Sequence, residues 1–173
     1  FYYDGTTGFD RASDASVSSE TKMTRSDTYK YDITFITNVT IGTNDLIKLQ
    51  SRTYYVGEKG EEISDYSENW TVKKNSAGTA YIDSIEKSST IFYYDGTTGF
   101  DRASGASVSS ETKMTRSDTY KFDTSFVTDV TIDVDDLIKL QSRTYYVGEK
   151  GEEISDYSEN WTVKKNSAGT SYI

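Results

Sequence analysis

The chain has 173 residues, a formal net charge of −9, and no His, Cys or Pro. The lack of His and Cys excludes the usual general base, thiol nucleophile, zinc site and disulfide. Basic runs are no longer than pairs such as Lys73-Lys74, so we expect no nucleic-acid partner. The longest apolar stretches fall far short of the roughly 20 residues that cross a bilayer, so we expect no membrane insertion. The first residue is Phe, which favours a processed chain or a segment of a longer protein.

The chain is one sequence written twice. Phe1 to Ile82 recurs as Phe92 to Ile173 at a constant offset, with ten differing positions, 14, 31, 33, 34, 36, 38, 42, 43, 44 and 80. A repeat of this length is the size of a small domain, so we predict two tandem domains of one fold. We predict their bounds as 1–86 and 92–173, with 87–91 as a linker or a shared edge strand. Most differences lie between 31 and 44, which makes that segment the candidate for distinct recognition by the two copies.

The predicted elements are strands separated by glycine turns. Gly5 and Gly8 mark a turn after the opening aromatics, and the polar segment 13–24 predicts a long loop or a short helical turn. Residues 29–41 alternate apolar and polar side chains, which predicts a half-buried strand or two strands joined by a bend. Further strands are expected at 46–56, 70–74 and 81–85. The predicted fold class is all-β, with two near-identical tandem β-sandwich (Greek-key) domains.

Two segments carry a resemblance to a known family. Thr90 to Arg102, TIFYYDGTTGFDR, resembles the opening strand and folded hairpin of the βγ-crystallin superfamily. Asn44 to Leu49 and Asp135 to Leu140 resemble its acidic calcium-loop segment, with Lys48 and Lys139 standing where the family has a Ser or Thr ligand. The resemblance implies two Greek keys per domain and a calcium-binding, crystallin-like protein. An immunoglobulin-like or jelly-roll sandwich is the alternative.

The candidate metal ligands are acidic and amide side chains in equivalent segments of the two copies. They are Asp133, Asp135 and Asp136 in the second copy, and Asn44 and Asp45 in the first. Oxygen ligands at alternate positions of a loop suit Ca²⁺, which is the one cofactor we consider. The alternative is a solvated acidic turn. Glu61, Glu62 and Asp65, with Glu152, Glu153 and Asp156, present the same choice with a weaker pattern.

Aromatic residues offer a second kind of site. Trp70 and Trp161, with the tyrosine pairs at 2–3, 54–55, 93–94 and 145–146, present the ring types of a carbohydrate-binding platform. Adjacent strand residues point to opposite faces, so we expect one tyrosine of each pair to lie outside. We expect both tryptophans to be mostly buried in equivalent core sites, with outward tyrosines forming cross-strand pairs.

No catalytic motif is present, so we expect no enzyme activity. The leading function is a structural or adhesive tandem-repeat module of an extracellular surface, matrix or filament protein. Its partners would be neighbouring repeats or copies of itself. A calcium-binding stability protein and a carbohydrate-binding module, with a glycan or protein ligand, are the alternatives.

Residues 83–91 raise an expectation about association. If they add an edge strand to the first copy, the second copy exposes the corresponding sheet edge. We then expect copies of the repeat to associate end to end.

Overall fold

The computed structural model describes residues 1–31, 41–122, 132 and 134–173, and its strands form one antiparallel sheet. The described residues also form the 3-10 helices η2 (Thr43–Lys48) and η4 (Val134–Lys139). The strands are β1 (Tyr2–Tyr3), β2 (Met23–Tyr29), β3 (Leu49–Val56), β4 (Ile63–Lys74), β5 (Tyr81–Tyr94), β6 (Asp101–Arg102), β7 (Met114–Lys121), β8 (Leu140–Val147) and β9 (Ile154–Asn160).

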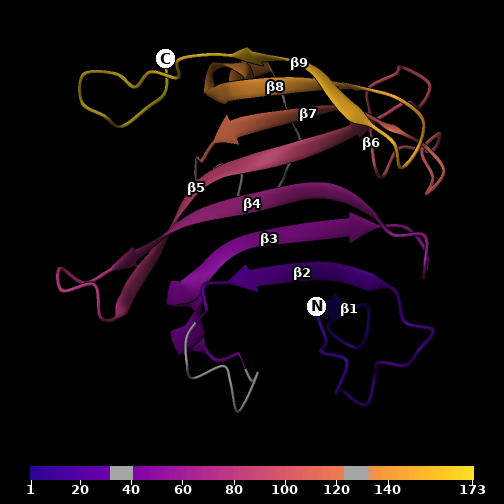
Figure 1. The fold of residues 1–173 in the computed structure, drawn as a ribbon, viewed down its shortest axis with the longest axis horizontal. Helices are drawn as coiled ribbons and strands as arrows, with labels where there is room; N and C mark the ends of the chain where they lie inside the picture. Colours follow the sequence, from indigo (N-terminus) through magenta and orange to yellow (C-terminus); the bar gives the residue numbers. More distant parts are fainter. Residues whose placement is uncertain (32–40, 123–131, 133) are drawn as a thin grey trace.

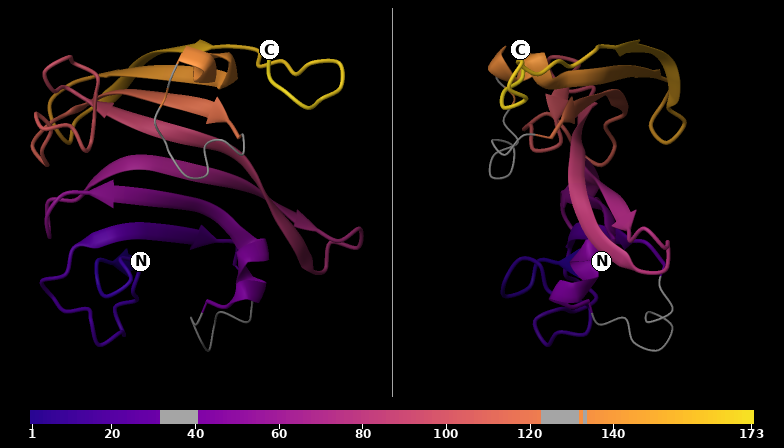
Figure 2. Two further views of the ribbon diagram at one scale, coloured as in Figure 1. Left: turned by 180° about the vertical axis from the view of Figure 1, so that it is seen from behind. Right: turned by 90° about the vertical axis from the view of Figure 1, so that its left-hand side faces the viewer.

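The strands follow one another across the sheet in the order of the chain. The order is β1-β2-β3-β4-β5-β7-β8-β9, and the short β6 pairs with β5. Figure 1 shows this succession from β1 to β9, and the edge-on view in Figure 2 shows a strongly twisted layer. The all-β prediction is therefore confirmed, whereas two Greek-key sandwiches are not. Apart from β6, strands that are consecutive in the chain are neighbours in the sheet, so the described strands make a meander instead of two packed sheets.

The two repeats meet in β5, which is hydrogen-bonded along both of its edges. Its residues 81–91 pair with β4, and its residues 88–94 pair with β7. Residues 87–91, expected to be a linker or a shared edge strand, lie within this element. The sheet consequently continues from one repeat into the next without an interruption.

Several strands begin or end away from their predicted positions. Strand β3 begins at Leu49 instead of residue 46, because 43–48 form η2. Strand β4 begins at Ile63 instead of residue 70, and β5 continues past residue 85 to Tyr94. Strand β2 was not predicted, and most of the segment predicted at 29–41 lies outside the described residues.

The buried apolar side chains gather around β5. One cluster contains Ile91 and Tyr93 of β5 with Tyr120 and Leu140 of the second repeat. The other contains Ile63 of the first repeat, with Tyr94 and Ala103 beyond the junction. Each cluster depends on β5, so the contact between repeats is also the main apolar core of the described chain.

Candidate interaction surface

Each repeat carries a row of aromatic and arginine side chains across neighbouring strands. Directly opposed residues share one face of a sheet. The first row is Tyr2, Arg25, Tyr54 and Tyr66, and the second is Tyr93, Arg116, Tyr145 and Tyr157. In each row the last two tyrosine rings stack, with centroids 4.4 Å apart in the first repeat and 4.6 Å in the second.

The arginine of each row is held between two rings and beside a buried carboxylate. The Arg116 guanidinium lies 4.1 Å from the Tyr93 ring centroid and 4.6 Å from that of Phe100. Its Nε lies 3.2 Å from Asp118 Oδ1, and Arg143 donates two hydrogen bonds of 2.8 and 2.7 Å to the same carboxylate. The Asp118 side chain is completely buried. Paired cations and bidentate hydrogen bonds compensate for removing this charge from water.

The first repeat reproduces this arrangement. Asp27 accepts two hydrogen bonds of 3.0 Å from Arg52, and Arg25 Nε lies 3.1 Å from its Oδ1. The Arg25 guanidinium lies 4.0 Å from the Tyr2 ring centroid. The arginine–aspartate cluster is therefore a structural unit of the repeat and not a site belonging to one copy.

Polar contacts join the first repeat to the second beside the apolar cluster of Ile63. Arg102 donates hydrogen bonds of 2.9 and 2.8 Å to the two carboxylate oxygens of Asp65. The Tyr94 hydroxyl donates a 2.6 Å hydrogen bond to the carbonyl oxygen of Ser64. Residues 94–114 of the second repeat thus contact the beginning of β4 in three ways. They pack against Ile63, form an ion pair with Asp65, and donate a hydrogen bond to the Ser64 carbonyl oxygen.

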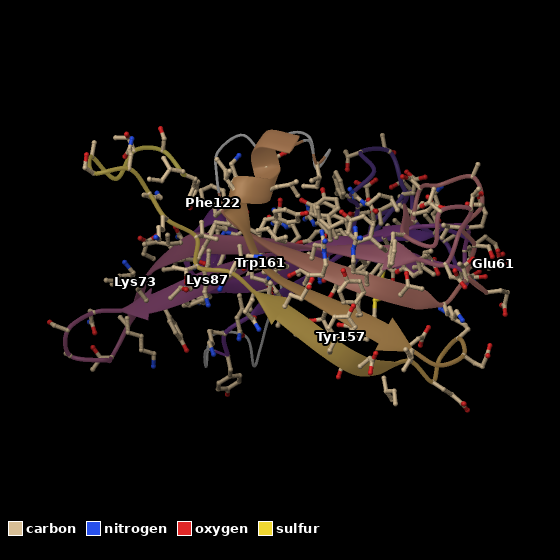
Figure 3. All side chains as sticks on the ribbon, turned by 90° about the horizontal axis from the view of Figure 1, so that it is seen from above. Glu61, Lys73, Lys87, Phe122, Tyr157 and Trp161 are labelled. Carbon is tan, nitrogen blue, oxygen red and sulfur yellow. The ribbon has the colours of Figure 1, made fainter. Side chains whose placement is uncertain are left out.

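The sequence ISDYSEN forms the first seven residues of β4 and the whole of β9, but β9 is the last strand of the sheet. Ile63 is 8% exposed, whereas its counterpart Ile154 is 66% exposed. Tyr157 and Trp161 are 52% and 43% exposed, and Figure 3 shows both at the β9 edge. Since these seven residues are identical, their different exposure comes from their neighbours. Strand β5 and residues 94–114 lie against β4, whereas no described strand lies along the outer edge of β9.

Glu86 lies opposite Trp70 where β4 pairs with β5. Burial, followed by the nearby charge of Glu68, raises the pKa of Glu86 to about 7, and Arg52 opposes the shift. Burial also raises the pKa of Glu68, while Arg52 and the Tyr54 hydroxyl lower it. These two carboxyl groups lie on neighbouring strands, so each is exposed to the charge of the other.

We expect Glu86→Gln to stabilise the protein at pH 8 and to leave its stability at pH 4 nearly unchanged. The folded-state pKa lies above the ordinary value of 4.5, so the folded state binds more protons between these values. Stability is therefore greatest at low pH and falls as pH rises through about 7. Because Glu86 is partly exposed, solvent screening reduces the gain to about 1 kcal/mol. Urea unfolding at the two pH values measures it, and an equal gain at both would contradict this cause.

Of the predicted calcium ligands, Asn44 and Asp45 lie in η2, and Asp135 and Asp136 lie in η4. Asp45 Oδ1 accepts a 3.0 Å hydrogen bond from Lys48, and Asp136 Oδ1 accepts one of 2.9 Å from Lys139. Asn44 is exposed, whereas Asp133 and the side chain of Asp135 lie outside the described residues. Within the described part of the chain, no three acidic residues are grouped as metal ligands. Calcium binding stays a prediction.

The prediction that both tryptophans are mostly buried in equivalent sites is wrong for Trp161. Trp70 is half-buried and Trp161 is exposed, because only Trp70 has a strand, β5, beside it. The expectation for the tyrosine pairs also fails at Tyr93 and Tyr94, which are both buried in the junction clusters. Of the acidic residues with the weaker pattern, Asp65 binds Arg102 and Glu62 accepts a 2.9 Å hydrogen bond from the Met23 amide.

Sequence analysis missed the arginine–aspartate clusters. Their local signal is Arg-Ser-Asp, at residues 25–27 and 116–118, in which alternate residues of a strand share one face. In the sequence, charged residues at alternate positions of a strand indicate a solvent-exposed face. The pattern therefore gave no indication that this Arg and Asp pack together on the inward face.

Comparisons of the chain with known protein families, with curated proteins and with solved structures found no match. Among the described residues, none of the helices combines the length and the apolar character needed to cross a membrane.

Proposed function

We propose that the chain is a structural or adhesive tandem-repeat module, and that it serves as a stiff spacer in an extracellular surface, matrix or filament protein. The observation that carries this proposal is the sharing of β5 between the repeats. Hydrogen bonds on both edges of β5, together with the Asp65–Arg102 pair, restrict movement of one repeat against the other. Repeats that share nearest-neighbour contacts build elongated bodies by simple addition.

A distance measurement between the repeats tests the proposal. The chain has no cysteine, so spin labels attach only at introduced positions. We expect labels at Lys59→Cys and Lys150→Cys, which occupy equivalent exposed turns, to give one narrow distance distribution. The control pair, Lys59→Cys with Lys73→Cys, lies within the first repeat. A distribution much broader between repeats than within one would reject a stiff spacer.

A carbohydrate-binding module is the second candidate, favoured by the exposed rings of Tyr157 and Trp161. Aromatic faces of this kind stack on sugar rings as well as on protein side chains. Glycan-array binding that disappears on Trp161→Ala would favour this candidate. We expect no such binding.

A further inference from the structure

We propose that the β9 edge binds the beginning of a further copy of this repeat, with the sequence of residues 81–103, as β4 binds that segment within the chain. This inference rests on the proposed structural function and names its partner. The first observation is the identity of the two strands. Ile154, Ser155 and Asp156 repeat Ile63, Ser64 and Asp65, so β9 carries the same three residues through which β4 contacts Tyr94, Arg102 and Ala103.

The partner groups are defined by the contacts of β4. Asp65 receives two hydrogen bonds from Arg102, whereas Asp156 is exposed on β9. The Ser64 carbonyl accepts its hydrogen bond from the Tyr94 hydroxyl. Ile63 packs against Tyr94 and Ala103. A segment that contains these residues would complete the same contacts on β9.

The main chain supplies the second part of the interface. Residues 66–74 of β4 pair with residues 81–91 of β5. In β9 the corresponding edge, from Tyr157 to Asn160, has no strand beside it among the residues that the structure describes. An extended segment can add to such an edge through main-chain hydrogen bonds, while side-chain contacts set its register.

The opposite end of the sheet carries the other half of this interface. Tyr3, Ala12, Val17 and Met23 are the counterparts of Tyr94, Ala103, Val108 and Met114, which surround Ile63. In the first repeat these four residues line a surface hollow, and Arg11 lies in the position equivalent to Arg102. The chain thus presents a strand edge at β9 and, at its other end, the residues that would contact such an edge. Contacts of this head-to-tail kind join successive copies into an open filament.

The test uses the full chain and a synthetic peptide with the sequence of residues 81–103. Trp70→Phe in the chain leaves Trp161 as the fluorescent reporter at β9. We expect saturable binding with a blue shift of Trp161 emission, because the added strand covers this ring as β5 covers Trp70. Asp156→Arg is on an exposed strand, and circular dichroism verifies its fold.

A charge reversal identifies the site. We expect Asp156→Arg to weaken peptide binding at least tenfold, and a peptide carrying Arg102→Asp to restore most of the affinity toward that variant. The matched control is Asp83→Arg in the chain, an exposed residue away from β9, which should leave the affinity unchanged.

Three results would overturn the proposal. They are the absence of binding, binding insensitive to Asp156→Arg, and self-association of the chain through β9 without any uptake of the peptide. The spin-label distances are measured without peptide, so a stiff pair of repeats combined with a failed peptide experiment would reject this inference and leave the spacer function standing.

Discussion

Replacing Asp118 by Asn should lower the free energy of unfolding by about 3 kcal/mol. Its side chain is completely buried, and Arg143 binds both carboxylate oxygens while Arg116 lies beside one of them. An amide keeps the volume but removes the negative charge and turns one acceptor into a donor that faces a guanidinium. Two partly buried cations then lose the compensation for their lost hydration. Chemical denaturation of the two proteins measures the difference.

The matched control is the same substitution in an exposed ion pair. The Asp95 carboxylate lies 3.6 Å from Lys113 Nζ, and its side chain is 48% exposed. Exposed pairs of this kind contribute little, so Asp95→Asn should change stability by less than about 0.5 kcal/mol. A loss below about 1 kcal/mol for Asp118→Asn would mean that the arginine–aspartate cluster does not hold the sheet together.

The all-β character was predictable, since it depends on the residue types along the chain. Alternation of residue types indicates strands, and a constant offset indicates two units of one fold. The inward side of β2 was not predictable in this way, because Arg25 and Asp27 occupy it. A charged side chain such as Asp27 can be buried only because Arg52 of β3 pairs with it. That contact joins residues far apart in the sequence, so a local pattern does not reveal it.

The candidate edge was harder still to predict. The first seven residues of β4 and the whole of β9 have one sequence and two environments, so no local signal separates them. Their difference depends on whether a strand like β5 lies alongside. The polar stretch Glu86 to Ser89 within β5 resembles a loop by composition, although Glu86, Ser88 and Ser89 pair with β4. The exposure of β9 thus depends on which strands lie beside it and not on its own sequence.

Ile91→Ala should destabilise both repeats together, by about 3 kcal/mol. Ile91 is completely buried in β5, where it packs with Tyr120 and Leu140 of the second repeat and with Tyr66 of the first. The lost methyl groups leave a cavity that lies between the repeats, so neither repeat can retain its stability alone. Trp161→Phe leaves Trp70 to report on the first repeat, and Trp70→Phe leaves Trp161 to report on the second.

In both single-tryptophan proteins, we expect Ile91→Ala to lower the urea midpoint by the same amount relative to the respective parent. The control, Ile85→Ala, lies in the same strand but at an exposed position, and should cost less than about 0.5 kcal/mol. A shift seen by Trp161 alone would show that the repeats unfold independently. Equal shifts would show that β5 couples them, which is the property a spacer needs if each added repeat is to continue the same stiff sheet.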